Sequence, residues 1–488
     1  MTEARNTLRF ILNDEDIALT EVPATQTLLD LLRLDKRLRG SKEGCAEGDC
    51  GACTVLVGRL RGGELIYEGV TACITFVGSL DATHVVTIEH LSAPGGPLHP
   101  VQQAMLDFHG SQCGFCTPGI VMSLYALWMR EPNPATSQVE QALQGNLCRC
   151  TGYSPILRAA KAISTYGEAE KDPLVAHRAA IKARILALRD GRRVEIGEGR
   201  GRLIVPGNID DLAEVYAAEP GATLVSGATD VGLWVTKFMR EFGPMIFIGE
   251  LPELHHIEAF GGSVKLGAAV TYTEAADAIT EHFPQLGELW YRIGGDQVRN
   301  MGTIGGNIAN GSPIGDTPPA LIVLGAHVTL RRGGERRDVK LKDFFIAYGK
   351  QDRQPGEFVE SVTIPLLPAG ERFACYKVTK RRDEDISALC GAFRVFLNED
   401  GKVGMARIAF GGMAATPKRA LAVEEALIGK PWDAATIDAA VAAFPTDYQP
   451  ISDMRASAEY RMLAAQNLLR RFHLETTGAT QHLEREVA

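Results

Sequence analysis

Several features are missing from this 488-residue sequence, and each absence excludes a class of protein. No apolar run is long enough to cross a membrane, and the segment 1–19 lacks the apolar centre of a signal peptide. The net charge is −9 and no stripe of basic residues is present, so nothing indicates a nucleic-acid partner. We therefore expect a cytoplasmic protein that binds neither membranes nor nucleic acid.

The common nucleotide-binding fingerprints are also missing. The sequence has no Walker A lysine and no G-x-G-x-x-G after a predicted strand, which disfavours P-loop and Rossmann sites. It has no internal repeat either, and its length exceeds what one core usually holds, so several different domains are expected. The eleven histidines are scattered, and we expect each to be structural, with His255 and His256 as a surface pair.

The apolar pattern divides the chain into units. Short alternating runs (8–12, 53–56, 65–67 and 85–88) with one helical stretch (27–34) predict a small α/β unit in 1–92. Helical periodicity predicts two helical hairpins in 93–166, with caps at Thr117 and Ser154 and a capping box at Ser137 and Glu140. A partly helical linker (167–195), an α/β domain (196–370), an α+β domain (371–475) and a tail (476–488) are expected to follow. The α/β domain contains apolar runs at 223–225, 245–248 and 321–324.

Eight of the ten cysteines lie in tight clusters within the first third of the chain, and in reducing cytosol such clusters indicate metal ligands. Cys45, Cys50, Cys53 and Cys73 have the C-x4-C-x2-C…C spacing of plant-type [2Fe-2S] ferredoxins. Gly44, Gly48 and Gly51 allow the loop to curl around sulfide. A four-cysteine zinc site is the alternative, although such sites favour widely separated CxxC pairs. The two remaining cysteines, Cys375 and Cys390, are interpreted as free core thiols.

The second cluster combines two weaker patterns. Cys113 and Cys116 fall in the turn of the first helical hairpin, and Cys148 and Cys150 fall in the turn of the second. Each pair alone could be a redox dithiol or half of a zinc knuckle. If the hairpins pack together, the four sulfurs form one metal site.

The segments around these cysteines, 112–119 (QCGFCTPG) and 146–153 (NLCRCTGY), resemble signatures of the molybdenum hydroxylase family. The resemblance covers nearly all of residues 7–166. It implies a β-grasp, ferredoxin-like [2Fe-2S] domain followed by a four-helix-bundle [2Fe-2S] domain, with the bundle cluster nearer the molybdenum–pterin cofactor. Gln112 occupies the position of a pterin-contacting glutamine in that family, and its alternative role is a turn-stabilising amide.

Two glycine-containing loops in the α/β domain predict an anion site, because small residues let backbone N–H groups approach a pyrophosphate. Both loops resemble the FAD-binding domain of the xanthine dehydrogenase flavoproteins, and 373–410 resembles the small domain that follows it there. In this resemblance Asp316 and Lys377 lie near the isoalloxazine, Val359 packs near the ring system, and 381–384 tunes flavin electrostatics, or is merely a solvated charge run. The residues assigned to FAD on this basis are Leu224, Val225, Ser226, Gly227, Ala228, Thr229, Asp230, Asn300, Gly302, Thr303, Gly305, Gly306, Asn307, Asp316, Val359 and Lys377.

The resemblance implies an NAD-dependent oxidoreductase subunit of the xanthine dehydrogenase type that carries two [2Fe-2S] clusters and FAD. Hydroxylation is expected on a molybdenum-binding partner chain, with no catalytic residue for that step here and with a dimer of heterodimers as the assembly. One alternative is the corresponding subunit for an aldehyde or an aromatic heterocycle. Another, of a different class, is a zinc-stabilised scaffold with a nucleotide-binding module.

Overall fold

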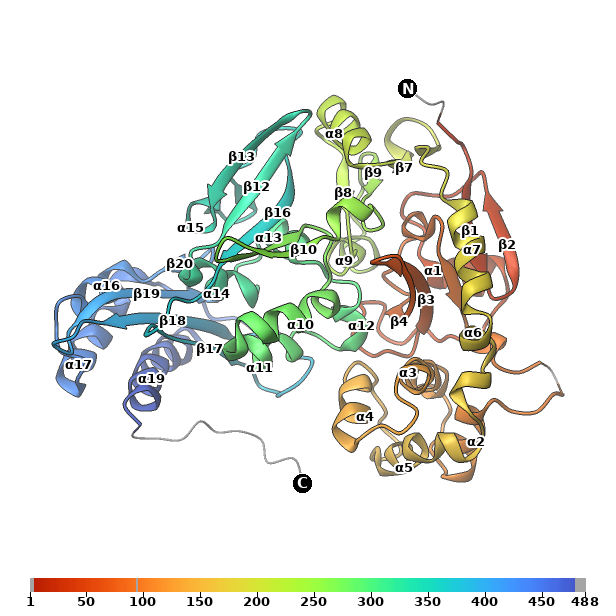
Figure 1. The fold of residues 1–488 in the computed structure, drawn as a ribbon, viewed down its shortest axis with the longest axis horizontal. Coiled ribbons are helices and arrows are strands. Elements are labelled where there is room, and N and C mark those ends of the chain that lie inside the picture. Colours follow the sequence, from red (N-terminus) through yellow and green to blue (C-terminus); the bar gives the residue numbers. More distant parts are fainter. Residues whose placement is uncertain (1–3, 94, 479–488) are drawn as a thin grey trace. The chain divides into compact units, whose positions relative to one another are not determined.

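The computed structural model describes residues 4–93 and 95–478 (Figure 1). By its internal contacts the chain divides into two compact units, each of which is described by itself. Unit 1 comprises residues 1–255 and 294–303, and unit 2 comprises residues 256–293 and 304–488. Residues 196–255 and 294–303 of the predicted α/β domain therefore belong to the unit that contains the clustered cysteines.

Unit 1 begins with a five-stranded sheet of order β2-β1-β5-β3-β4. Its strands are β1 (Leu8–Leu12), β2 (Glu15–Leu19), β3 (Thr54–Arg61), β4 (Glu64–Thr71) and β5 (His84–Val86). Helix α1 (Leu28–Asp30) continues into a π-helical turn, and its leucines pack with Phe10, Val55 and Phe76 in one core. β1 has the predicted bounds, whereas β2 was not predicted, because it buries only Ile17 and so shows little alternation.

Four helices follow, as predicted: α2 (Pro100–Asp107), α3 (Thr117–Arg130), α4 (Thr136–Ala142) and α5 (Ser154–Ala162). The predicted caps are wrong. Thr117 and Ser154 are the first residues of their helices, and the cap positions belong to Cys116 and Tyr153. α4 begins before Ser137, and Gln138 Oε1 accepts a hydrogen bond from the Ala135 N–H at 2.7 Å.

The predicted linker contains α6 (Pro173–Ala176) and α7 (Arg178–Leu188). Leu174 and Ile185 are fully buried in the same hydrophobic cluster as the four-helix region. This segment is therefore packed against the helices rather than extended. Asp172 caps α6 and accepts hydrogen bonds from Tyr125 (2.7 Å) and from the ring of His99 (3.0 Å), so His99 has the structural role that we predicted.

A second sheet of unit 1 has the order β6-β7-β9-β8, with β7, β9 and β8 parallel. Its elements are β6 (Val194–Ile196), β7 (Leu203–Val205), α8 (Ile209–Ala218), β8 (Thr223–Val225), α9 (Val231–Thr236) and β9 (Met245–Phe247). The predicted apolar runs at 223–225 and 245–248 are thus strands. α12 (Asp296–Arg299) joins unit 1 from later in the chain.

Unit 2 contains an antiparallel sheet of order β10-β11-β16-β12-β13 and a short β14-β15 hairpin. The strands are β10 (Ile257–Phe260), β11 (Ser263–Gly267), β12 (His327–Arg332), β13 (Glu335–Lys340), β14 (Phe345–Ala347), β15 (Lys350–Gln351) and β16 (Phe358–Pro365). The helices here are α10 (Tyr272–His282), α11 (Gly287–Tyr291), α13 (Ile304–Asn310), α14 (Thr317–Leu324) and α15 (Leu341–Phe344). The apolar run 321–324 is the end of α14.

The rest of unit 2 is α+β, as predicted. Its sheet has the order β17-β18-β19-β20, formed by β17 (Arg372–Val378), β18 (Leu389–Leu397), β19 (Val403–Gly411) and β20 (Lys418–Arg419). Helices α16 (Leu421–Leu427), α17 (Ala434–Ala442), α18 (Phe444–Asp447) and α19 (Ala458–Thr476) complete it. Most of the predicted tail, 479–488, lies outside the described residues.

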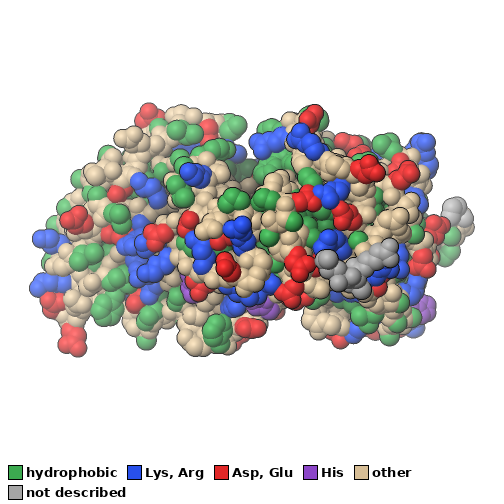
Figure 2. All heavy atoms as spheres, turned by 90° about the horizontal axis from the view of Figure 1, so that it is seen from above, with side chains coloured by type: hydrophobic (Ala, Val, Ile, Leu, Met, Phe, Trp, Pro, Cys, Tyr) green, Lys and Arg blue, Asp and Glu red, His purple; other side chains and the backbone are tan. Residues whose placement is uncertain are grey.

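Among the described residues, no helix combines the length and apolar character that a membrane span requires. On the face drawn in Figure 2, Lys and Arg side chains are interspersed with Asp and Glu side chains. This mixture agrees with the charge pattern read from the sequence.

Candidate cofactor sites

The first cysteine set lies on the loop between α1 and β3 and just after β4. Cys53 and Cys73 are buried, whereas Cys45 and Cys50 are half-buried. The loop turns through left-handed backbone at Ala46, Gly48 and Gly51. At Gly44 a Cβ would stand 2.8 Å from Cys50 Sγ, so glycine allows the backbone to approach the sulfur closely there. The loop therefore curls as the sequence predicts.

The four sulfurs of this set contact one another. Hydrogen bonds from the Cys50 and Cys73 side chains hold the pKa of the Cys45 thiol well below its usual range, and the same contacts raise the pKa of Cys50 and Cys73. Cys45 Sγ also accepts hydrogen bonds from the N–H groups of Cys50 (3.4 Å) and Glu47 (3.5 Å). Backbone donors aimed at sulfur stabilise thiolates, the form that binds metal.

The second set joins the α2–α3 turn to the α4–α5 turn, as predicted. Its contacts are pairwise, Cys113 with Cys150 and Cys116 with Cys148. A hydrogen bond from the Phe115 backbone lowers the pKa of Cys113, and burial raises the pKa of Cys116 to about 12. Burial alone would raise the pKa of Cys148, but hydrogen bonds from Thr151 outweigh it and lower this pKa. Thus the two hairpin turns bring four thiols into one site.

Both sets fit [2Fe-2S] clusters. Within the part of the chain that the structure describes, no three His, Cys, Asp or Glu side chains are arranged around a single metal ion. That finding concerns one ion, whereas a [2Fe-2S] cluster divides four thiolates between two irons. In the second set the cysteines contact one another in two pairs, which agrees with two thiolates on each iron. In the first set, backbone N–H groups point toward Cys45 Sγ, which agrees with a thiolate ligand.

Gln112 lies beside the second set, and its side chain is exposed. It makes no hydrogen bond with any described residue, so the alternative role as a turn-stabilising amide has no support in the structure. Cys113 and Cys150 are exposed at the same place, together with Phe115 (47% exposed) and Leu147 (41% exposed). The second set is therefore accessible from outside this chain.

The first predicted flavin loop follows β8 in unit 1. Among the described residues, the backbone N–H groups from Ser226 to Thr229 donate to no protein acceptor, and Ser226 Oγ is buried without a partner. Ala228 has a φ of 58°, which turns the loop through left-handed backbone. Successive unpaired N–H groups in such a turn form an anion-binding concavity. This loop fits the pyrophosphate of FAD.

The second predicted loop is divided between the two units, with residues 300–303 in unit 1 and 304–307 in unit 2. The N–H of Gly302 donates to Val298 O (2.7 Å), and the N–H of Gly305 donates to Ala268 O (3.1 Å). A Cβ on Gly305 would lie 2.6 Å from Ala268 Cα. We expected glycine here to let the backbone approach the cofactor, but at Gly305 the close approach is to the protein itself.

Asp316 and Lys377 are brought together in unit 2. Lys377 Nζ lies 2.5 Å from Asp316 Oδ2, and Ser387 Oγ donates to Asp316 Oδ1 at 2.5 Å. The Lys377 side chain is only 2% exposed, and the Asp316 carboxylate is its partner in a buried ion pair. Val359 is buried on β16, and Asn307 accepts a hydrogen bond from Thr317 next to Asp316.

The charged loop 381–384 is held in place by hydrogen bonds and is not merely a solvated run of charges. Arg292 donates to the carbonyls of Lys377 (3.3 Å) and Arg382 (3.1 Å) and to Thr379 Oγ1 (3.1 Å). Arg381 donates to the Glu384 carbonyl at 3.0 Å, and Glu384 has a φ of 50°. The loop therefore has a defined conformation beside Lys377.

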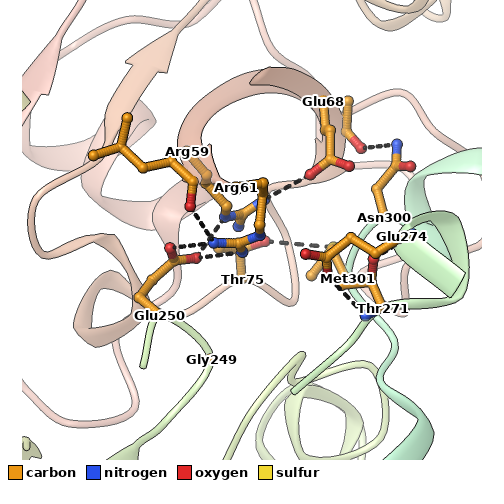
Figure 3. A network of polar contacts seen from close by, with 12 residues as sticks. Arg59, Arg61, Glu68, Thr75, Gly249, Glu250, Thr271, Glu274, Asn300 and Met301 are labelled. Carbon is orange, nitrogen blue, oxygen red and sulfur yellow. Dashed lines mark hydrogen bonds and ion pairs between the residues drawn. The ribbon is translucent and has the colours of Figure 1, made fainter. Parts of the chain in front are cut away.

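A buried ion-pair network links β3 to the segment after β9 (Figure 3). Glu250 accepts from Arg61 (2.9 and 3.0 Å) and pairs with Arg59 at 2.8 Å. Burial alone would raise the pKa of Glu250, but the two guanidinium groups lower it to about 2. Within unit 1, this network joins the β2-β1-β5-β3-β4 sheet to the loop that follows β9 in the β6-β7-β9-β8 sheet.

The remaining predicted features are structural. Cys375 and Cys390 are free thiols, as predicted, with their sulfurs 3.7 Å apart on neighbouring strands. His255 and His256 are half-buried, so the predicted surface pair is wrong, and His255 Nε2 contacts Gly249 O at 2.8 Å. Gln297, a fully buried amide between the two cysteine sets, was not predicted, because a single polar residue in a short helix has no recognisable pattern.

Four family models match the chain in sequence. Residues 10–78 match "2Fe-2S iron-sulfur cluster binding domain" and residues 87–161 match "[2Fe-2S] binding domain". Residues 198–367 match "FAD binding domain in molybdopterin dehydrogenase" and residues 374–476 match "CO dehydrogenase flavoprotein C-terminal domain". Both cysteine sets and both predicted flavin loops lie within the matching segments.

Curated relatives include the xanthine dehydrogenase of Emericella nidulans, 31% identical over 500 residues, which cover 91% of this chain and 36% of the relative. The xanthine dehydrogenase of Drosophila subobscura is 33% identical over 489 residues, 88% of this chain and 36% of the relative. The chain thus spans little more than a third of these relatives. A carbon monoxide dehydrogenase structure from Hydrogenophaga pseudoflava is 28% identical, with a TM-score of 0.52, over 55% of this chain and 93% of that one. The four domain matches, in this order on one polypeptide, show that the chain belongs to the molybdenum hydroxylase family and carries its iron–sulfur and flavin domains.

Proposed function

We propose that this chain is the electron-transfer subunit of a xanthine dehydrogenase. In this proposal, electrons from xanthine or hypoxanthine, oxidised at a molybdenum–pterin cofactor on a large partner subunit, pass through the two clusters to FAD and then to NAD+. The cofactors supply the redox chemistry, and the residues of this chain hold and orient them. The assembly would be a dimer of heterodimers in the cytoplasm.

The observation that carries the proposal is the combination on one chain of two four-cysteine sets and a loop with unpaired N–H groups. Cys113, Cys116, Cys148 and Cys150 would hold the cluster nearer the partner, because Cys113 and Cys150 are exposed beside Gln112. Cys45, Cys50, Cys53 and Cys73 would hold the second cluster, and Ser226 to Thr229 would bind the FAD pyrophosphate. A molybdenum-binding partner chain is supported by the carbon monoxide dehydrogenase likeness, since that enzyme has a molybdenum cofactor. The four family models that match this chain describe only iron–sulfur and flavin domains.

The first test is composition. Natively purified protein should contain four irons, four labile sulfides and one FAD per copy of this chain. Stoichiometric zinc in place of iron would contradict the proposal and favour the zinc-stabilised scaffold.

The second test concerns substrate and partner. The complex should reduce NAD+ with xanthine, and mass determination after gel filtration should show a molybdenum-containing partner. Turnover of an aldehyde or an aromatic heterocycle, but not of xanthine, would instead assign the chain to another member of the family. A lone chain that oxidises xanthine would contradict the partner.

A further inference from the structure

Gln297 lies at a junction of three elements of unit 1. Its side chain is 1% exposed, and Nε2 lies 2.9 Å from Asn146 Oδ1 and 3.1 Å from both Thr54 Oγ1 and Ser123 Oγ. Thr54 follows Cys53 of the first set, Asn146 precedes Cys148 of the second set by two residues, and Ser123 belongs to α3. One amide group therefore contacts both cluster-binding regions.

The hydroxyl groups around Gln297 define which end of its amide faces them. Thr54 Oγ1 donates its proton to Gly51 O at 2.6 Å, and Ser123 Oγ donates to Asn146 Oδ1 at 2.7 Å. Both oxygens can then only accept from Gln297, which requires the NH2 end of the amide. Gln297 Oε1 is buried without a hydrogen-bond partner among the described residues. The site thus uses Gln297 as a donor and leaves its oxygen unpaired.

The network ends on the backbone of both cluster loops. Asn146 Nδ2 donates to Gly51 O at 3.2 Å, and the Leu147 N–H donates to Cys50 O at 3.0 Å. Gly51 lies between the ligands Cys50 and Cys53, and Leu147 is bonded to Cys148. The hydrogen bond from the Leu147 N–H to Cys50 O, with a few covalent bonds on each side, therefore joins Cys50 of the first set to Cys148 of the second.

The packing around this path leaves little room for movement. A Cβ on Gly119 would lie 2.0 Å from Gly51 O, and a Cβ on Gly145 would lie 1.8 Å from Gln297 Oε1. Glycine at both positions allows this close approach. The two loops are thus held at a single separation by contacts on both sides of Gln297.

The segment that carries Gln297 also contacts the flavin loop. Asn300 Nδ2 donates to Gly69 O at 2.9 Å. Met301 Sδ accepts from Thr75 at 3.7 Å (Figure 3) and from Thr71 at 3.5 Å, and these two threonines lie on either side of Cys73 in the sequence. A Cβ on Gly227 would lie 1.7 Å from Met301 O. Residues 296–303 therefore touch both cysteine sets and the loop with unpaired N–H groups.

We propose that Gln297 is a positioning residue that sets the separation and electronic coupling of the two clusters. The inference rests on the proposed function, because it requires both cysteine sets to hold [2Fe-2S] clusters. The step that it serves is the transfer of one electron, by which the cluster on Cys113, Cys116, Cys148 and Cys150 is oxidised and the cluster on Cys45, Cys50, Cys53 and Cys73 is reduced. No proton or covalent bond changes in this step.

The test uses Gln297→Met in the full chain, purified with its partner. Methionine has a similar length but cannot donate to Thr54, Ser123 or Asn146. With both clusters reduced by dithionite, the magnetic splitting between them in the electron paramagnetic resonance spectrum reports their separation. We expect this splitting to shift or disappear, and we expect electron redistribution between the clusters after flash reduction to become slower. Iron and sulfide content should remain at the parent level.

Gln103→Met on α2 is the matched control, because among the described residues the Gln103 side chain donates only to Asp107, at an exposed position. It should leave the splitting and the rate unchanged. If Gln297→Met loses a cluster, Ser123→Ala removes one hydrogen bond of the same network and should give a smaller shift of the same kind. Parent splitting and parent rate in a variant with full cluster content would overturn the inference while leaving the proposed function intact. A parent protein without iron would overturn the proposed function itself.

Discussion

At the scale of single residues, the effect of the Lys377–Asp316 pair on stability can be measured separately from its effect on NADH oxidation. Asp316→Asn removes the counter-charge of a lysine that is 2% exposed, and breaking such a pair costs about 3–5 kcal/mol. Lys377→Met likewise leaves a carboxylate without its cation. We expect both single variants to lower the thermal unfolding temperature and to slow NADH oxidation.

The double variant Asp316→Asn and Lys377→Met removes both charges together, and such replacements are often nearly neutral for stability. Its unfolding temperature should recover, whereas NADH oxidation should stay slow if the pair serves the flavin. Calorimetry and stopped-flow reduction by NADH measure the two effects. Full oxidation rates in the double variant would show that the pair has only a structural role.

His84 predicts a dependence of stability on pH. Its ring is buried, with Nδ1 2.7 Å from Tyr67 Oη and Nε2 2.7 Å from Asn13 O, and burial lowers its pKa to about 4. The unfolded chain, with an ordinary histidine pKa of about 6.5, binds a proton in the range between these values that the folded chain does not. Stability should therefore be complete above pH 6.5 and should fall by about 3 kcal/mol as the pH decreases to 4.

The measurement is the unfolding temperature at a series of pH values for the parent and for His84→Gln. Glutamine can retain one donor and one acceptor but does not titrate, so the loss between pH 6.5 and 4 should become smaller. His177→Gln, at an exposed position of the same unit, is the control. An identical pH profile in the parent and in His84→Gln would assign the acid sensitivity to other groups.

Residues with a characteristic spacing could be predicted from the sequence, and residues defined by packing could not. The spacing of the eight cysteines predicted two four-sulfur sites, and the structure brings the side chains of each set into contact. Gly305 was predicted to admit the cofactor but meets Ala268, because a sequence does not show which side of a glycine is crowded. Gln297 was missed for a related reason, since its three acceptors come from Thr54, Ser123 and Asn146, far away along the chain.

At the scale of elements, the turn after β8 depends on the absence of a side chain at Gly227. Gly227→Ala would place a Cβ 1.7 Å from Met301 O and push the two loops apart. Overpacking of this kind costs about 1–3 kcal/mol, and if the strain falls on the FAD-bound state it corresponds to a loss of about fivefold to 150-fold in FAD affinity. The ratio of FAD to iron after gel filtration should fall, while iron content stays constant.

Gly221→Ala is the control for this variant. Gly221 precedes β8, and a Cβ there would meet no atom within 4 Å. Its FAD content should equal that of the parent. Equal FAD retention in the two variants would show that the turn after β8 does not bind the cofactor.

Element types and order were largely predictable, but element ends were not. β1, β8 and the four helices with their cysteine turns follow from apolar periodicity. The caps at Thr117 and Ser154 were misplaced by one residue, because Cys116 and Tyr153 are held at the cap positions by the cysteine site. Tyr153 has a φ of 67°, and its hydroxyl accepts a hydrogen bond from the Cys148 N–H at 2.8 Å. A tertiary contact therefore overrides the local capping preference.

At the scale of the whole molecule, the proposed order of electron carriers predicts that the two half-reactions can be separated. Cys148→Ala removes a ligand of the cluster nearer the partner, so FAD reduction by xanthine should be lost. Dye reduction by NADH through FAD should be largely retained. Anaerobic stopped-flow spectroscopy of each half-reaction measures both.

Loss of one ligand could unfold the helical domain, since cluster binding and folding are coupled. Circular dichroism and co-purification of the partner are therefore needed as controls, together with Cys375→Ala, which removes a thiol outside both sets. Xanthine-driven FAD reduction at the parent rate in a folded, assembled Cys148→Ala enzyme would show that the proposed path is wrong.

The order of domains along the chain was predictable, but the composition of the compact units was not. Local patterns indicated boundaries near residues 166 and 195, where the periodicity changes. They could not indicate that residues 294–303 return to the iron–sulfur part of the molecule, because this return depends on buried contacts of Gln297, Asn300 and Met301.

The return of α12 to unit 1 has a consequence for how the coding sequence could be divided during evolution. A gene break between α7 and β6 would separate the iron–sulfur and flavin domains into two polypeptides. The contacts of Gln297, Asn300 and Met301 would then lie between two gene products. These contacts are already buried and complementary, so they would form the interface between the two separated polypeptides. A fused chain and a divided pair could then replace each other in evolution without the appearance of a new binding surface.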